Sequence, residues 1–203
     1  MAVQSGVYRG LSADERAAER RERLLEATLE VWADPTQRTT MTAVCASAGL
    51  TERYFYESFK SLDEALRAVL EAIAVEIEAV TQAAADDAGA DPLTQAQAVL
   101  ASFIGLIGAD PRKGRVAIIE AGAMAELRGR RTELLRHFAH RSAVEARDRL
   151  GLPHRPPAEE EMAGLLFIGG MAELVTAWLD GVIEASPDEL VAAASRNFLA
   201  LYA

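Results

Sequence analysis

Hydroxyl, aromatic and basic side chains lie close together in a short segment in the first third of the chain. They are Thr51, Arg53, Tyr54, Tyr56 and Lys60. Hydroxyl and cationic groups donate hydrogen bonds to phosphate oxygens, and a guanidinium can also donate a pair of bonds to a guanine edge. Residues of these types predict a nucleic-acid contact if one helix presents them together.

Two short helices joined by a glycine are expected to position this cluster. The first has apolar residues at i, i+3, i+4 and i+7, which gives it one buried face; they are Met41, Val44, Cys45 and Ala48. Gly49 suits the left-handed conformation at a helix end, and Thr51 can cap the second helix, 51–57. The pattern predicts a helix-turn-helix, whose second helix fits the major groove of B-DNA.

An ordinary helical corner shares the helix-glycine-helix pattern, so the surrounding chemistry must distinguish the two interpretations. Thr40 and Thr51 each begin a helix, where free N–H groups and the positive dipole end suit phosphate. The bulky or apolar neighbours are expected in the core rather than at a contact surface; they are Val44, Cys45, Phe55 and Phe59. Cys45 is interpreted as a packing residue, not as a redox sensor.

Residues 20–66 resemble the N-terminal domain of TetR-family transcriptional regulators. The resemblance rests on RERLLEATLEVW at 21–32, MTAVCASAGL at 41–50, TERYFYESF at 51–59 and LDEAL at 62–66. Its most specific part is AGLT at 48–51 followed by FYESF at 55–59. It implies an N-terminal three-helix DNA-binding domain, followed by a larger helical bundle for ligand binding and dimerisation.

The resemblance also implies roles for individual residues. Thr40 and Tyr56 would contact phosphate, Lys60 would hold the DNA backbone, and Thr51, Glu52 and Arg53 would occupy base-reading positions. Glu52 could accept a bond from a cytosine amino group or stabilise the helix N-terminus, and the second role is favoured. Two departures from the family pattern are Leu62, which replaces a frequent basic residue, and the link 33–39, which lacks a glycine-aromatic pair.

Composition predicts an all-α fold, because the chain is rich in alanine and almost free of alternating strand patterns. Helices are expected near 12–33, 41–48, 51–57, 61–86, 92–109, 111–127, 130–150, 158–184 and 187–202. Residues 1–11 are predicted to form a disordered arm, 12–60 the DNA-binding domain and 61–203 the ligand-binding and dimerisation domain.

Charge and motif content restrict the class of protein. The chain has 21 basic and 31 acidic residues, a net charge of −10, so contact with DNA requires a local patch rather than an overall positive field. A single cysteine excludes an internal disulfide. The usual catalytic and metal-binding motifs are absent, so no catalytic residue, metal or cofactor is predicted. No secretory signal or membrane span is expected, which favours the cytoplasm.

The second domain offers weaker signals. Apolar residues expected to line an effector pocket are Phe103, Ile107, Met124, Phe167, Met171 and Trp178, and they favour a hydrophobic or aromatic effector. Gly164, Phe167, Gly169 and Gly170 are expected either at a homodimer interface, which is favoured, or in a close-packed core. The arginine-rich segment 128–149 is a nucleic-acid patch, an anionic-ligand site or, as favoured here, a solvated helix face. His137 and His140 lack a third metal ligand.

Taken with the resemblance, these features predict a ligand-responsive homodimeric repressor that binds a near-palindromic double-stranded DNA operator. Activation instead of repression would depend on the position of the operator. A helical protein-protein adaptor, or an enzyme with an unrecognised site in the bundle, is the alternative.

Overall fold

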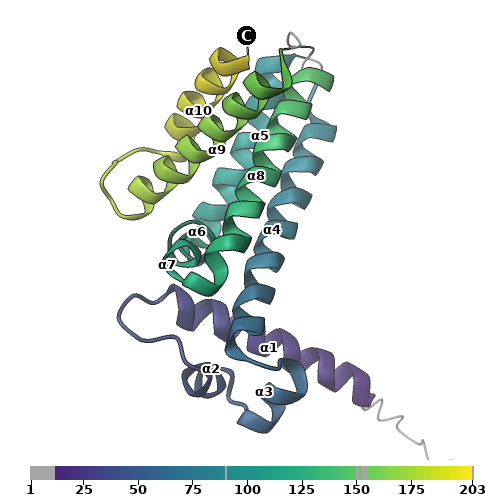
Figure 1. The fold of residues 1–203 in the computed structure, drawn as a ribbon, viewed down its shortest axis with the longest axis vertical. Helices are drawn as coiled ribbons and strands as arrows, with labels where there is room; N and C mark the ends of the chain where they lie inside the picture. Colours follow the sequence, from purple (N-terminus) through teal and green to yellow (C-terminus); the bar gives the residue numbers. More distant parts are fainter. Residues whose placement is uncertain (1–11, 90, 150, 152–154, 203) are drawn as a thin grey trace, which may run out of the picture. The chain divides into compact units, whose positions relative to one another are not determined.

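The computed structural model describes residues 12–89, 91–149, 151 and 155–202, and all regular structure in this part of the chain is helical (Figure 1). The all-α prediction is confirmed. The predicted disordered arm, 1–11, lies outside the described residues. Contacts divide the chain into two compact units, Met1–Leu66 and Arg67–Ala203.

The first unit contains three helices and the first turn of a fourth. They are α1 (Ala13–Ala33), α2 (Met41–Ala48), α3 (Glu52–Ser58) and α4 (Leu62–Asp87). A capping box begins α1: the Glu15 N–H donates to Ser12 Oγ at 3.1 Å, and the Ser12 N–H donates to Glu15 Oε2 at 2.6 Å. Gly49, at φ 61°, ends α2 in the left-handed conformation that its position predicted.

Polar and aromatic contacts from α1 fix α2 and α3 around a small core. The core side chains Leu24, Trp32, Val44, Phe55 and Phe59 are all buried. Arg23 Nη2 donates to the Ala48 carbonyl at 2.6 Å, so α1 binds the end of α2. The Arg21 guanidinium lies 4.7 Å from the centre of the Phe59 ring, a distance typical of a cation-π contact. Both short helices are thereby held in place by α1.

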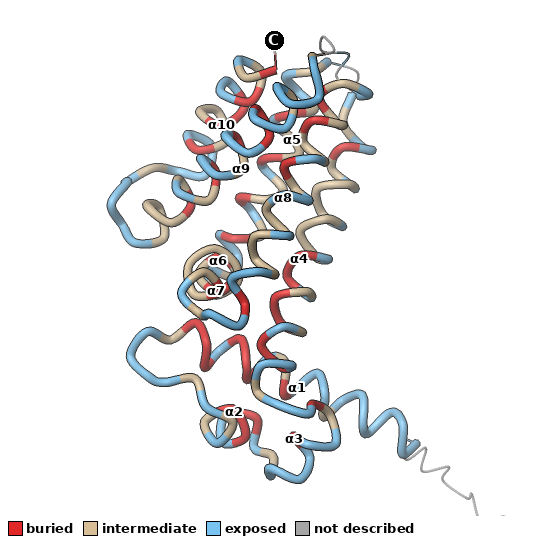
Figure 2. The backbone as a smooth tube through the Cα atoms, viewed as in Figure 1, coloured by how far each residue is buried: buried red, intermediate tan, exposed pale blue. Residues whose placement is uncertain are grey.

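The second unit is a bundle built from the remainder of α4 and the elements that follow. They are α5 (Pro92–Ala109), α6 (Pro111–Gly114), the π-helical turn η1 (Arg115–Glu120), α7 (Ala121–Ala123), α8 (Ala125–Asp148), α9 (Pro157–Leu179) and α10 (Pro187–Tyr202). The helix α8 packs on α9, and α5 packs on α10. In Figure 2 the long helices carry buried residues on some sides and exposed residues on others, as expected for helices around one core.

The prediction of one continuous helix at 111–127 is wrong. The segment is broken into α6, η1 and α7, and the chain becomes extended at Met124 (φ −86°, ψ 123°) before α8 begins at Ala125 instead of at residue 130. Close packing accounts for part of this distortion: a Cβ on Gly114 would lie 2.8 Å from Ile107 and 2.9 Å from Leu179. The backbone must therefore approach both neighbouring helices at this point.

The helix predicted at 158–184 is also too long, because α9 ends at Leu179. Gly181 adopts φ 70°, and its N–H donates to the Trp178 carbonyl at 3.1 Å. The Val182 N–H donates to the Ala177 carbonyl at 2.8 Å, which completes a Schellman motif. Gly181 is therefore a stop signal that the sequence prediction overlooked.

The border between the compact units differs from the predicted domain border at residues 60 and 61. Ala65 and Leu66 are fully buried and are grouped with the first unit, so the border lies inside α4. Two helices, α5 and α9, are long and apolar enough to cross a membrane by length and composition alone. Both contribute side chains to the core of the bundle, among them Ile104 and Val175.

Candidate nucleic-acid interface and ligand cavity

The predicted DNA-contact residues are all exposed; they are Thr40, Thr51, Glu52, Arg53, Tyr54, Tyr56 and Lys60. The opposite face of α3 is buried: the Phe55 side chain is 0% exposed, whereas the adjacent Tyr56 is 59% exposed. Phe55 and Phe59, like Val44 and Cys45, belong to the core, as predicted. The helix α3 therefore has one face that anchors it and one face that presents polar groups to solvent.

The two threonines at the helix starts differ in their local bonding. Thr40 Oγ1 accepts from the Ala43 N–H at 3.2 Å, so this hydroxyl caps α2 and still has its own hydrogen to donate. Thr51 occupies the corresponding position before α3, but its side chain makes no capping bond. The Thr51 hydroxyl is thus left available for an external partner.

The cations on the exposed face differ in how they are paired. Arg53 Nε donates to Glu57 Oε1 at 3.0 Å, and the Arg53 side chain is 84% exposed. Lys60 has no ion-pair partner in the part of the chain that the structure describes. Arg38, exposed shortly before Thr40, has none there either. The sequence analysis did not select Arg38 as a candidate for DNA contact. The only feature that pointed to it was its position in the 33–39 link, just before Thr40.

The environment of Cys45 agrees with its predicted packing role. Burial raises the pKa of the Cys45 thiol, and the negative charge of Glu52 raises it further. The thiol therefore stays protonated at neutral pH, a state with little nucleophilic reactivity. Glu52 is exposed in the first turn of α3, where a carboxylate interacts favourably with the helix dipole.

The two departures from the family pattern have simple local structures. The link after α1 folds into a turn in which Asp34 Oδ1 accepts from the Thr36 N–H at 2.8 Å and from Thr36 Oγ1 at 2.7 Å. These hydrogen bonds lower the pKa of Asp34. Leu62 is half-buried at the start of α4, so its side chain contributes to packing and offers no donor to a phosphate.

A cavity of about 220 Å³ lies within the second unit and touches α4, α5, η1, α8, α9 and α10. Four predicted pocket residues line it: Phe103, Ile107, Phe167 and Met171. Most other lining side chains are apolar, and they include Leu70, Ile73, Ile77, Val99, Leu100, Leu134, Leu135, Phe138, Ile168 and Phe198. An apolar ligand body would therefore meet a mostly apolar surface in this cavity.

Met124 and Trp178 are not among the lining residues, so their assignment to the pocket is corrected. Met124 occupies the extended break before α8 and leads into that helix. Trp178 Nε1 donates to the Ala185 carbonyl at 3.1 Å, and its ring lies against Gly108. Both residues were chosen for apolar character, which does not distinguish a pocket wall from ordinary packing.

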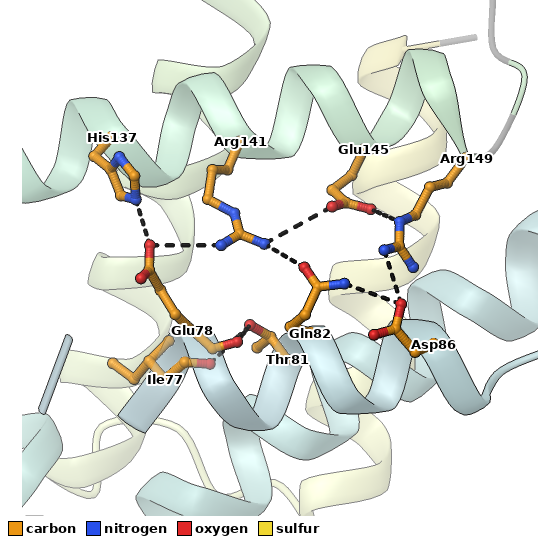
Figure 3. A network of polar contacts seen from close by, with 9 residues as sticks. All are labelled: Ile77, Glu78, Thr81, Gln82, Asp86, His137, Arg141, Glu145 and Arg149. Carbon is orange, nitrogen blue, oxygen red and sulfur yellow. Dashed lines mark hydrogen bonds and ion pairs between the residues drawn. The ribbon is translucent and has the colours of Figure 1, made fainter. Parts of the chain in front are cut away.

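A network of polar contacts joins α4 to α8 beside the cavity (Figure 3). Arg141 lies 2.9 Å from Gln82 Oε1, 3.5 Å from Glu78 and 3.8 Å from Glu145. Arg149 pairs with Asp86 at 2.8 Å and with Glu145 at 2.9 Å (Figure 3). The arginine-rich segment is thus not simply a solvated helix face, because several of its arginines bind α4.

His137 belongs to the same network, in which its Nε2 contacts Glu78 (Figure 3). The hydrogen bond with His137 is the main cause of a lowered Glu78 pKa. His140 lies exposed on the same helix. Among the described residues no group of three or more His, Cys, Asp or Glu side chains could hold a metal ion.

The predicted interface residues separate into two groups. Gly164 is buried against the backbone of Ala139, and a Cβ on Gly164 would overlap the Ala139 carbonyl. The Phe167 ring packs edge-on against the Phe198 ring, with 5.0 Å between the ring centres. Gly164 and Phe167 therefore pack inside the bundle, which corrects their assignment to a dimer interface. Gly169 and Gly170 are exposed, with nothing within 4 Å of an added Cβ.

The exposed side of α9 near these glycines is apolar. Met162, Leu165 and Leu166 are 56%, 41% and 66% exposed. Exposed apolar side chains that gather on one helix face mark an interaction surface more often than isolated ones do. These residues together with Gly169 and Gly170 form an exposed apolar surface on α9; the α9 face is defined here as Met162, Leu165, Leu166, Gly169 and Gly170.

The chain thus combines a three-helix unit that contains a helix-turn-helix with a helical bundle that holds an apolar cavity. No family model matches the sequence, and no curated protein matches it. Solved structures do match, and the fold is that of TetR-family transcriptional regulators, as the sequence resemblance predicted.

Three similar structures illustrate the extent of the match. The fatty acid degradation regulator FadR from Bacillus halodurans has a TM-score of 0.75 and 16% identity, over 89% of this chain and 94% of that one. A TetR-family regulator from Syntrophomonas wolfei has a TM-score of 0.76 and 14% identity, over 91% and 95%. A TetR-like regulator from Rhodococcus sp. RHA1 has a TM-score of 0.66 and 20% identity, over 94% and 99%.

Proposed function

We propose that the protein is a cytoplasmic, sequence-specific DNA-binding transcriptional regulator that acts as a ligand-responsive homodimeric repressor. The observation that carries this proposal is the divided surface of α3. Phe55 and Phe59 anchor the helix in the core, while Thr51, Arg53 and Tyr56 face solvent. A helix of this kind can enter the major groove with its polar residues against base edges and phosphates.

A dimer follows from the geometry of recognition. Two recognition helices can address half-sites about one DNA turn apart only if two chains associate, and such an operator is near-palindromic. The exposed α9 face supplies apolar surface for that association. A response to ligand then needs only that the ligand prefer one of two arrangements of the DNA-binding heads.

The test is selection of bound sequences from random double-stranded DNA, using purified full-length protein freed of co-purified ligand. Enrichment of an inverted repeat is expected, because a symmetric dimer reads the same half-site twice. Binding without sequence preference, or no binding by ligand-free protein, would contradict the proposal and favour an adaptor or an enzyme. Transcription from a promoter that carries the selected site would then distinguish repression from activation.

A further inference from the structure

Arg131 differs from the other arginines that line the cavity. It lies on α8, half-buried, and its Nε donates to the Ile118 carbonyl of η1 at 3.0 Å. No carboxylate in the described part of the chain lies within ion-pair distance of it. Its remaining N–H groups, on Nη1 and Nη2, therefore have no anionic partner among the described residues.

The backbone around Arg131 holds its guanidinium in place. A Cβ on Gly122 would lie 3.3 Å from Arg131 Nε and 3.6 Å from Cζ, so the absence of a side chain at residue 122 gives the group room. Arg128 reaches the same region, with its Nε 3.4 Å from the Gly122 carbonyl. Glu120, the acidic residue of η1, pairs instead with Arg115 at 3.6 Å. This end of the cavity is thus electropositive.

The other polar groups of the lining are satisfied within the protein. Gln95 Nε2 donates to the Gly89 carbonyl at 2.6 Å, and Ser142 Oγ lies 2.9 Å from Tyr202 Oη. Arg141 and Arg149 are bound by Glu78, Glu145 and Asp86. Glu145 itself lines that side, so a second anion placed there would meet a negative charge.

We propose that the cavity binds an amphipathic organic acid, whose carboxylate lies on Arg131 and whose apolar body lies among Phe103, Phe138 and Phe167. This inference rests on the proposed function, since it names the chemical class of the effector. An unpaired guanidinium beside an apolar wall lacks a counter-charge, and a carboxylate supplies one in the paired geometry that arginine favours. The apolar remainder of the cavity has no polar group that requires a second polar substituent.

Paired probes test the inference directly. Dodecanoate and dodecan-1-ol share one apolar body, as do 2-naphthoate and 2-naphthalenemethanol, and only the first member of each pair is charged. Isothermal titration calorimetry at neutral pH would compare wild type, Arg131→Gln and the control Arg136→Gln, which alters an exposed arginine on the same helix. Thermal unfolding would verify that each variant is folded.

The wild type is expected to bind at least one acid about tenfold more tightly than its alcohol, as a charged hydrogen bond allows. Arg131→Gln should remove that preference and leave alcohol binding unchanged, while Arg136→Gln should behave as wild type. The inference is overturned if neither pair shows acid preference, or if Arg131→Gln weakens acid and alcohol alike. The same preparation would be used for DNA selection, so an enriched inverted repeat without acid preference would refute only the ligand class.

Discussion

Arg130 on α8 binds Glu71 on α4 through two parallel hydrogen bonds, from Nε at 2.5 Å and from Nη2 at 2.7 Å. Two more carboxylates further along α4 are also paired. Glu76 accepts from Lys113 of α6 at 2.7 Å, and Asp86 pairs with Arg149, which follows α8. The carboxylates of α4 are thus tied repeatedly to basic residues of the bundle. Because α4 forms one wall of the cavity, these ion pairs determine how firmly that wall is held.

The Glu71–Arg130 pair should make stability depend on pH. Hydrogen bonds from Arg130 are the main cause of a Glu71 pKa below its ordinary value of 4.5. A lowered folded-state pKa stabilises the fold above the unfolded value, and this stability is lost as pH falls through the folded value. Glu71→Gln should cost about 0.5 kcal/mol at neutral pH, since partly exposed pairs contribute little.

Thermal unfolding at a series of pH values from neutral to well below 4.5 would measure this effect, because the stability is lost as the pH falls through the lowered pKa of Glu71. The difference between wild type and Glu71→Gln should shrink as the pH falls. Glu19→Gln, which alters an exposed carboxylate on α1, is the matched control and should show no such trend. A constant difference at every pH would refute the assignment.

Gly164 should be intolerant of any side chain. An added Cβ would overlap the Ala139 carbonyl, a backbone atom that cannot turn aside. Gly164→Ala should therefore lower the free energy of unfolding by about 1–3 kcal/mol, as overpacking usually does. Gly105→Ala on α5, where nothing lies within 4 Å, should instead raise it by up to about 1 kcal/mol through helix propensity. Chemical denaturation measures both, and equal effects would contradict the close approach of α8 and α9.

The features that the sequence predicted well depend on neighbours along the chain. Helices are expected to begin near residues 12, 41 and 92, and Ser12, Thr40 and Asp91 cap them there, because a capping side chain bonds to a backbone N–H only a few residues away. Gly49 likewise ends α2 as expected. The same local logic could have identified Gly181, whose position after Asp180 was overlooked as a stop.

The features that could not be predicted depend on distant parts of the chain. Arg130 and Glu71 are 59 positions apart, and their pairing requires α4 and α8 to lie side by side. Apolar character identified Phe103 and Met171 as pocket residues, but it could not exclude Trp178, which is partly buried and packs against the core outside the cavity. In the sequence Arg131 is one of several arginines in the same segment, and nothing separates it from the others. Only the fold shows that its neighbours Arg130 and Arg141 pair with carboxylates while Arg131 does not, within the described residues.

The α9 face should mediate dimer formation. Leu166 is 66% exposed at its centre, and a charge there would have to be buried without a partner on association. Leu166→Glu should therefore shift the protein to a monomer in sedimentation velocity and reduce operator binding. Val75→Glu, which changes a residue on α4 that is 63% exposed, is the matched control and should remain dimeric. If Leu166→Glu also remains dimeric, the interface lies elsewhere.

Lys60 should contribute to DNA affinity without contributing to sequence preference. It is exposed and has no ion-pair partner among the described residues, so its charge is available to a phosphate. Lys60→Ala should weaken binding to all sequences alike and reduce the slope of log affinity against log salt by about one. Fluorescence anisotropy over a salt series, with operator and scrambled DNA, would measure both. A loss confined to the operator would show that Lys60 reads bases.

Arg53 should show the opposite behaviour, because we propose that it reads a base from the exposed face of α3. In the free protein the Arg53 guanidinium pairs with Glu57, and 84% of the Arg53 side chain is exposed. Because an exposed ion pair contributes little free energy, Arg53 can exchange it for hydrogen bonds to a guanine edge at little cost. Arg53→Ala should lower operator affinity by about 1–3 kcal/mol and relax preference at one position of each half-site. Repeating the sequence selection with the variant measures that preference, with Lys60→Ala as the comparison. If Arg53→Ala keeps the full preference while affinity falls for all sequences, Arg53 contacts phosphate rather than a base.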